Sequence, residues 1–302
     1  MPRSAARPVA LVTGASRGIG KATAVALAGS GYDVALTART VHPGTGYDDS
    51  DVGGHRMLPG SLEETATQIE ALGARAQPVV ADLLDYQSLQ AAAAAVLRSW
   101  GRIDVLVNNA IYTGPGGMVP FLELTVEQLE TRLRANVVAQ MVMTQSVLPA
   151  MLAAGGGVIV DISSHVALAD PPAPVGQGGW GLGYAASKGA FHRMAGILAV
   201  EFADRGVRAY NVDPGFVDTE RQQANAAANG LAGRYRGAPP SVPAAAVAWL
   251  ATAPEAAALN GQTVRAQKLA LDRGLHPDWR EPVSREGADG RGPAPPPRTG
   301  AA

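Results

Sequence analysis

The sequence predicts an α/β fold in three layers, with a doubly wound parallel sheet and helices on both faces of that sheet. Short apolar runs alternate with longer helical segments along most of the chain. The runs are nearly continuous in hydrophobic residues, as in parallel strands that are buried on both faces, and repeated β–α alternation favours a parallel sheet. We expect strands at residues 9–13, 33–37, 78–81, 103–107, 158–162 and 207–212.

Helical periodicity fills the stretches between these strands. Two of the segments begin with a capping-box pattern, in which Ser61 precedes Glu64 and Thr125 precedes Gln128. The expected helices span residues 19–29, 62–72, 86–100, 126–153 and 184–205.

We expect one domain at residues 8–284, because the chain shows no second compositional region and no internal repeat. A short extension (1–7) precedes it. The Pro- and Gly-rich tail (285–302) is expected to be disordered, although its proline run could also be a recognition peptide. Two long loops interrupt the domain, at 40–60 and 167–183.

Composition argues against several kinds of partner and site. The chain has 302 residues and a net charge of -1, so nothing favours nucleic acid or an anionic membrane as a partner. The absence of cysteine excludes disulfides and thiolate metal sites, and the five histidines lack metal-ligand spacing. We predict no metal requirement. With no signal peptide and no apolar run near ~18 residues, we expect a cytoplasmic protein.

A tyrosine and a lysine four positions apart are the most informative residues. Tyr184 and Lys188 fall in an expected helix, where positions i and i+4 share a face. Lysine is rare in this chain, with Lys21 and Lys268 the only others. A nearby positive charge favours phenolate and lowers a tyrosine pKa. We therefore expect Tyr184 to exchange a proton with a substrate oxygen.

A glycine-rich turn from Thr13 to Gly20 joins the first expected strand to the first expected helix, with the spacing G-x-x-x-G-x-G. Glycines there let the backbone approach a pyrophosphate, and the helix N-terminus supplies amide donors. Arg39 ends the second strand where an acidic residue would bind the ribose of NAD, and Arg17 lies in the turn. We predict that NADP(H) is preferred, with its 2′-phosphate on the two guanidinium groups.

Two observations leave that prediction open. Both arginines could be solvated surface groups, and an acidic run at residues 47–51 leaves the same edge of the sheet. NAD(H) therefore remains a possible cofactor.

Other motifs follow these in a fixed order. They are Asp82 after the third strand, Asn108-Asn109-Ala110 after the fourth, Asn136 in the long helix, Ser163-Ser164 after the fifth, and Pro214 to Thr219 after the sixth. With these motifs the chain resembles a short-chain dehydrogenase/reductase of the single-domain type, from about Pro8 to Leu271. The resemblance implies a Rossmann fold and a homo-oligomer, either a tetramer or a dimer.

The resemblance also implies roles for individual residues. Tyr184 would give or take the proton, Lys188 would lower the pKa of that tyrosine and bind the nicotinamide ribose, and Asn136 would anchor a water. Ser164 would hold the substrate oxygen, with Ser163 as the alternative. The implied cofactor contacts are Gly14, Ser16, Arg17, Gly18, Ile19, Gly20, Arg39, Asp82, Leu83, Asn109, Ala110, Tyr184, Lys188, Pro214, Gly215, Val217 and Thr219.

The chain departs from the family pattern in two places. Ile111 stands where the family usually has glycine, and the serine and tyrosine are twenty positions apart, farther than usual. The extra residues, 169–180, could bring His165 and Trp180 to the substrate pocket or form a surface excursion. We expect the segment 220–240 to be a mobile lid.

These observations favour an oxidoreductase that transfers hydride between NADP(H) and a small carbonyl or alcohol substrate. A non-catalytic dinucleotide sensor or scaffold is the alternative, and a proton-relay set of residues argues against it. A nucleotide-sugar epimerase or dehydratase of the longer type is disfavoured by the glycine spacing.

Overall fold

The computed structural model describes residues 7–233 and 237–279, and within them seven parallel strands form one sheet in the order β5-β2-β1-β6-β7-β8-β9. The chain moves outward from β1 to β5 and then returns to place β6 on the other side of β1. This reversal leaves a crevice at the carboxyl ends of the strands, where α/β proteins bind ligands. The strands are β1 (Val9–Thr13), β2 (Asp33–Ala38), β5 (Ala76–Val80), β6 (Val105–Asn108), β7 (Gly157–Ile162), β8 (Val207–Asp213) and β9 (Thr263–Arg265).

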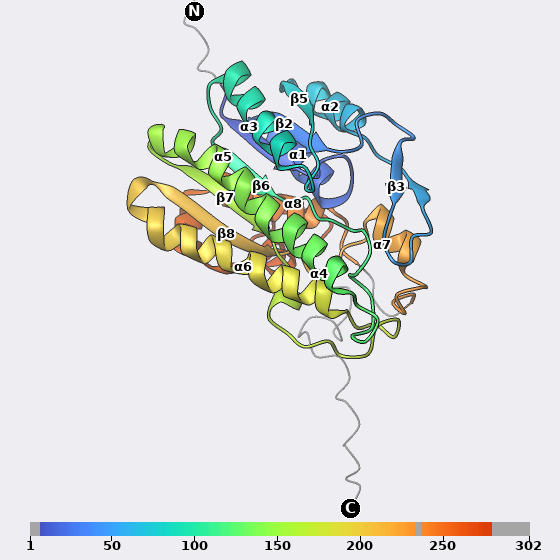
Figure 1. Ribbon diagram of the computed structural model, residues 1–302. Helices are drawn as coiled ribbons and strands as arrows, with labels where there is room; N and C mark the ends of the chain where they lie inside the picture. The colour runs from blue at the N-terminus through green and yellow to red at the C-terminus, as the bar shows by residue number, and fades with distance from the viewer. Residues whose placement is uncertain (1–6, 234–236, 280–302) are drawn as a thin grey trace, which may run out of the picture.

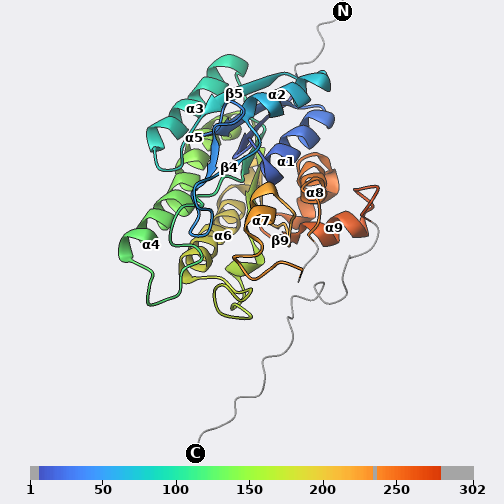
Figure 2. The ribbon, with the colours of Figure 1, turned by 90° about the vertical axis from the view of Figure 1, so that its right-hand side faces the viewer.

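Helices cover both faces of the sheet, which confirms the predicted three-layer Rossmann fold (Figures 1 and 2). One face carries α1 (Gly18–Gly29), α2 (Leu62–Ala71) and α8 (Ser241–Thr252), and the other carries α3 (Tyr86–Trp100), α5 (Ala139–Ala153) and α6 (Leu182–Phe202). Two shorter helices, α4 (Val126–Leu133) and α9 (Ala266–Asp272), complete the body.

The buried strands supply side chains to two separate cores, one on each face. In β1, Ala10 and Val12 pack with α1, α2 and α8, whereas Val9 and Leu11 pack with α3, α5 and α6. Successive side chains of a strand point to opposite faces, so a strand that is covered on both sides must be hydrophobic at every position. This explains why the strand predictions rested on continuous apolar runs.

The first six strands of the sheet lie within a few residues of the prediction, and five long helices lie where expected. The capping patterns form as well: the Ser61 hydroxyl accepts from the amide of Glu64 at 3.1 Å, and Thr125 and Gln128 make a complete capping box. The expectation of a continuous helix over 126–153 needs one correction. A π-type turn at Arg134–Val138 separates α4 from α5.

The expectation of an irregular loop over 40–60 was wrong. An antiparallel hairpin of β3 (Gly46–Asp48) and β4 (Arg56–Leu58) occupies it, because runs of three residues are too short to show strand periodicity. The hairpin lies beside α7 (Glu220–Asn225), at the right of Figure 1. Residues 234–236 of the expected lid and the whole tail lie outside the described residues.

The stretch Val126–Ala153 is the single helical segment in the described part of the chain that is long and apolar enough to cross a membrane. Half of its most apolar window is buried within the fold. Met143, Val147 and Met151 are fully or almost fully buried in the second core. The apolar character of this helix is therefore accounted for by its packing against the sheet.

Candidate active site

The glycine turn between β1 and α1 has a backbone that only glycine can adopt without strain. Gly14 and Gly18 have φ angles of 66° and 57°, in the left-handed region. A Cβ atom on Gly20 would lie 2.3 Å from the carbonyl oxygen of Gly14. The side chain of Asn109 secures the turn, because its Nδ2 donates to the carbonyl of Thr13 at 2.9 Å.

The N-terminus of α1 opens onto this turn. Its N-cap residue, Arg17, supplies no side-chain cap, and the first helical amide, that of Gly18, donates to the carboxylate of Glu220 at 3.1 Å. A carboxylate of the chain itself thus lies where the helix dipole favours an anion. Tight glycine packing together with this anion-binding amide fits the pyrophosphate of a dinucleotide.

The two arginines that were expected to bind a 2′-phosphate have different surroundings. Arg17 donates to the backbone carbonyls of Pro59 and Gly60 at 2.8 and 3.1 Å, at the base of the hairpin. Arg39 forms an ion pair with Asp49 at 3.0 Å, and its side chain is 49% exposed. Of the two guanidinium groups, that of Arg39 is the more open to a ligand.

Tyr184, Ser164 and Lys188 come together at the carboxyl end of β7. Tyr184 lies in the first turn of α6, and its phenol shares a hydrogen bond with the hydroxyl of Ser164, which follows β7. Lys188 is one turn further along the helix and is almost fully buried. Its Nζ donates to the carbonyl of Ile162 at 2.7 Å. The predicted pair therefore shares one helix face.

The expected lowering of the tyrosine pKa is not seen. Burial raises the pKa of Tyr184, and the charge of Asp213 raises it further, which outweighs the lowering by the Ser164 hydrogen bond and by Arg132. The ammonium of Lys188 is directed to the Ile162 carbonyl. Burial also lowers the pKa of Lys188, to about 8. The phenol is accordingly protonated at neutral pH.

The neighbouring serine is turned the other way. Ser163 is almost fully buried, and its hydroxyl lies 2.8 Å from Nδ1 of His192, whose Nε2 in turn lies 3.0 Å from the hydroxyl of Thr263. Only Ser164 of the two meets Tyr184. This geometry favours Ser164 over the alternative.

Asn136 occupies the π-type turn and is buried. Its Oδ1 accepts from the amide of Tyr112 at 2.7 Å, and its Nδ2 donates to the hydroxyl of Ser187 at 3.3 Å. Ser187 precedes Lys188 in α6. The side chain thus joins the long helix to α6, and a π-type turn at such a point is common at functional sites.

Other predicted contacts lie beside the glycine turn and in the loops that follow the strands. Thr219 caps α7 through its hydroxyl, and its methyl would lie 3.3 Å from a Cβ on Gly18, so it packs on the glycine turn. Asp82 binds the amide of Leu84 and shapes the turn after β5. The remaining predicted positions lie in the loops that follow β1, β5, β6 and β8, apart from Ile19 in the first turn of α1: Ser16, Ile19, Leu83, Ala110, Pro214, Gly215 and Val217.

The sequence reasoning missed Gln267, which donates from Nε2 to the carbonyls of Pro214 and Phe216 at 3.0 and 2.9 Å. It holds the segment after β8 in place from α9, an element too short to be predicted. Trp180, a candidate pocket residue, is half-buried, and its indole nitrogen is buried with no partner within the described residues.

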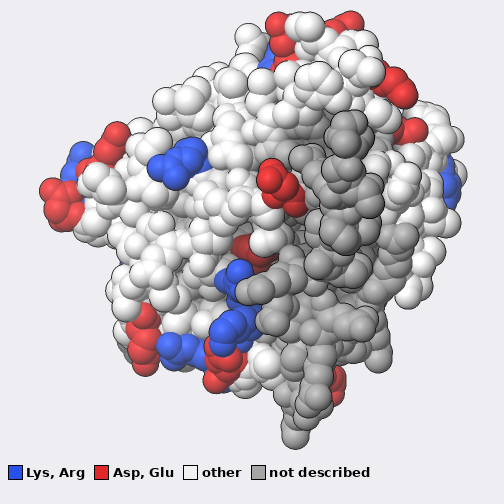
Figure 3. All heavy atoms as spheres, turned by 90° about the horizontal axis from the view of Figure 1, so that it is seen from below, with Lys and Arg blue, Asp and Glu red and all other residues white. Residues whose placement is uncertain are grey.

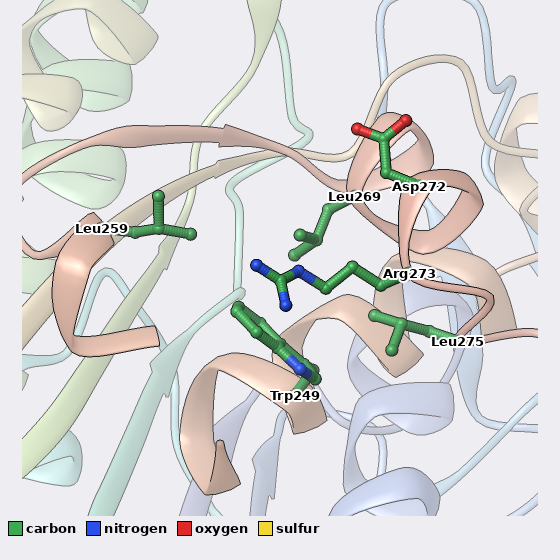
Figure 4. Close-up of a pocket in the computed structure, with 6 residues that line it drawn as sticks. All are labelled: Trp249, Leu259, Leu269, Asp272, Arg273 and Leu275. Atoms are coloured by element: carbon green, nitrogen blue, oxygen red, sulfur yellow. The ribbon is translucent and has the colours of Figure 1, made fainter. Parts of the chain in front are cut away.

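A hollow of about 550 Å³ lies away from these residues, among α8, α9 and the short 3-10 helix Pro254–Leu259. Figure 4 shows the guanidinium of Arg273 above the indole of Trp249, 4.4 Å from a ring centre. None of the predicted site residues lines it.

Comparison with known proteins agrees with this geometry. A family model described as short chain dehydrogenase matches residues 8–47 and 54–230. The chain belongs to the short-chain dehydrogenase family. The residues between the two matched ranges, 48–53, begin at the last residue of β3 and cover most of the turn of the β3–β4 hairpin.

Several members of this family are similar to the chain. A 2-(R)-hydroxypropyl-CoM dehydrogenase from Xanthobacter autotrophicus is 36% identical, over 71% of this chain and 76% of its own. An L-rhamnose 1-dehydrogenase (NAD(P)(+)) from Sphingomonas is 34% identical, over 70% and 72%. The crystal structure of a 3-oxoacyl-[acyl-carrier protein] reductase from Brucella melitensis in complex with NAD superposes with a TM-score of 0.70 at 30% identity, over 87% and 96%. The chain is thus an NAD(P)-dependent oxidoreductase that acts on small alcohol or carbonyl substrates.

Proposed function

We propose that the protein is an NADP(H)-preferring oxidoreductase that interconverts a carbonyl compound and its alcohol, with Tyr184 as general acid and base. The observation that carries the proposal is the hydrogen bond between Ser164 and Tyr184, one helical turn from buried Lys188. A bound nicotinamide would supply or accept the hydride.

The side chains have complementary tasks in this scheme. The Ser164 hydroxyl donates a hydrogen bond to the substrate oxygen and fixes its position. On reduction the phenol of Tyr184 gives its proton to that oxygen, and on oxidation the phenolate takes the proton back. The raised pKa of Tyr184 keeps the phenol protonated at neutral pH, which suits carbonyl reduction.

Lys188 and Asn136 act behind the tyrosine. Lys188 would bind the nicotinamide ribose, which requires its ammonium to share or leave the Ile162 carbonyl. Asn136 would anchor a water that links Lys188 to solvent. Its side-chain bonds to the amide of Tyr112 and the hydroxyl of Ser187 hold Asn136 against α6.

Gly14, Ser16, Gly18, Ile19 and Gly20 would surround the pyrophosphate. Asp82 and Leu83 would border the adenine. Asn109 and Ala110 would also contact the cofactor, Asn109 through its backbone. Pro214, Gly215, Val217 and Thr219 would hold the nicotinamide carboxamide. The preference for NADP(H) rests on the half-exposed guanidinium of Arg39, with Arg17 contributing positive charge nearby.

The test is a screen of NADPH and NADH consumption with ketosteroids, quinones, 3-ketoacyl thioesters and aliphatic ketones. We expect turnover with at least one class, a higher kcat/KM with NADPH, and loss of turnover in Tyr184→Phe. Cofactor binding without turnover, unaffected by that substitution, would instead indicate a sensor.

We further propose a cytoplasmic homo-oligomer, a tetramer or dimer, because the family resemblance implies one. Light scattering coupled to size-exclusion chromatography measures the assembly directly, and a monomer at working concentration would refute it.

A further inference from the structure

Three acidic residues of the hairpin segment bind three different neighbours, which are α7, residues 116–118 and Arg39. Asp48 is fully buried and accepts from Nδ2 of Asn225 in α7 at 2.6 Å. Asp51 accepts from three successive backbone amides, Gly116, Gly117 and Met118, at 2.8, 3.0 and 2.8 Å. Asp49 alone pairs with a residue of the expected cofactor site, Arg39.

The pair of Asp49 and Arg39 differs from its neighbours in being accessible. Asp49 Oδ2 lies 3.0 Å from Arg39 Nη2, and the side chains are 32% and 49% exposed. His55 approaches the other carboxylate oxygen at 3.8 Å, and its ring stacks on Tyr47 at 4.6 Å. The carboxylate is therefore held beside Arg39 by the fold of the hairpin, while a ligand can still reach the guanidinium.

Arg39 lies next to the cofactor turn. The amide of Ala15, within the glycine turn, donates to the carbonyl of Thr37 at 3.0 Å, and Arg39 follows two residues later at the end of β2. A dinucleotide with its pyrophosphate on this turn would present its adenosine ribose to the end of β2.

We propose that Asp49 opposes the binding of a 2′-phosphate by holding Arg39, and so sets how strongly the enzyme discriminates between NADP(H) and NAD(H). The inference rests on the proposed function for the location of the cofactor. A phosphate monoester carries nearly two negative charges at neutral pH, so it must both displace Asp49 from Arg39 and lie near its carboxylate. NAD(H) has a neutral hydroxyl at that position. Its binding therefore requires neither the displacement of Asp49 from Arg39 nor the approach of a negative charge to the carboxylate.

The other charged groups around Asp49 and Arg39 are bound to other partners. Arg17 donates to hairpin carbonyls. Arg221 faces buried Asp48, with Nε 3.3 Å from its carboxylate, and Glu220 faces the amide of Gly18. Figure 3 shows basic and acidic side chains side by side on the face seen from below.

The experiment measures dissociation constants of NADPH and NADH by isothermal titration calorimetry for the wild type and for Asp49→Asn. We expect the variant to bind NADPH about tenfold more tightly, as for the gain of one charge-assisted contact, and NADH within about twofold of the wild type. The gain should shrink in high salt, because the pair is exposed. An unchanged ratio of the two constants would overturn the proposal.

Two controls separate this effect from general damage to the hairpin. Asp51→Asn weakens the attachment to Gly116, Gly117 and Met118 without touching Arg39, and should leave the ratio unchanged. On an Arg39→Ala background, Asp49→Asn should improve NADPH affinity by much less, because only the repulsion between the phosphate and the carboxylate is then relieved. A change of ratio with Asp51→Asn as large as that with Asp49→Asn, or an equally large gain without Arg39, would show that Asp49 does not act through Arg39.

The same data distinguish failure of this inference from failure of the proposed cofactor preference. A wild type that binds NADH more tightly refutes the preference, yet the inference stands if Asp49→Asn still improves NADPH alone. A wild type that prefers NADPH, with no response to Asp49→Asn, refutes the inference alone. If neither cofactor binds, both are wrong.

Discussion

The ammonium of Lys188 is bound to the backbone carbonyl of Ile162, at 2.7 Å, and the residue just before Ile162 on β7 is the fully buried Asp161. Burial raises the pKa of Asp161 to about 7, although a hydrogen bond from Asn108 and the charge of Lys188 both lower it. One carboxylate oxygen has no hydrogen-bond partner within the described residues. The charge of the Asp161 carboxyl group, which interacts with Lys188, therefore changes near neutral pH.

We predict that Asp161→Asn flattens the dependence of stability on pH. Because the folded pKa of about 7 exceeds the ordinary aspartate value of 3.8, the contribution of Asp161 to stability is fully present below the unfolded pKa and is lost as pH rises through the folded pKa. The loss is on the order of 4 kcal/mol, at 1.4 kcal/mol per pH unit. Asparagine does not titrate, so it removes this loss.

Urea unfolding from pH 4 to pH 8 checks the prediction. The stability of the Asn variant relative to the wild type should rise across the window and level off above pH 7. Parallel curves would mean that Asp161 is ionised throughout in the folded protein.

A second prediction concerns the direction of the reaction. Since the pKa of Tyr184 is raised, kcat/KM for alcohol oxidation should increase with pH from 6 to 8, while kcat/KM for carbonyl reduction stays nearly constant there. Tyr184→Phe should lower both by about 10²–10⁴-fold and leave the dissociation constant of the cofactor nearly unchanged. Oxidation that is independent of pH would argue against the phenolate as the base.

Two glycines of one helix provide a matched pair of substitutions. Gly20→Ala should abolish cofactor binding and destabilise the protein, because its Cβ would lie 2.3 Å from the Gly14 carbonyl oxygen. Gly29→Ala, in the same helix, meets nothing within 4 Å and should be neutral or stabilising by up to about 1 kcal/mol. Thermal unfolding and cofactor titration of both variants test this, and equal behaviour would contradict it.

Glu220→Gln should strengthen the binding of NADH and NADPH equally, by roughly 3- to 10-fold. Its carboxylate occupies the Gly18 amide at 3.1 Å, where a pyrophosphate would otherwise bind, and glutamine keeps the shape without the charge. Titration calorimetry with both cofactors measures the effect. Weaker binding in the variant would show that Glu220 assists the cofactor instead of competing with it.

Sequence reasoning located the sheet because each strand had to be apolar on both faces, and it located Tyr184 and Lys188 because helix spacing alone puts them on one face. It assigned the wrong direction to the pKa of Tyr184, since the burial of the phenol and its proximity to Asp213 depend on the folded packing. The hairpin and Gln267 were missed because short elements carry too few residues for a periodic signal.

Asp51 links the hairpin to Gly116, Gly117 and Met118, while Asp48 links it to α7. The hairpin therefore connects two segments that are far apart in the chain, residues 116–118 and α7. In hydrogen–deuterium exchange, the three amides should open together with α7 as one unit, and releasing Asp51 should speed the exchange of all three at once.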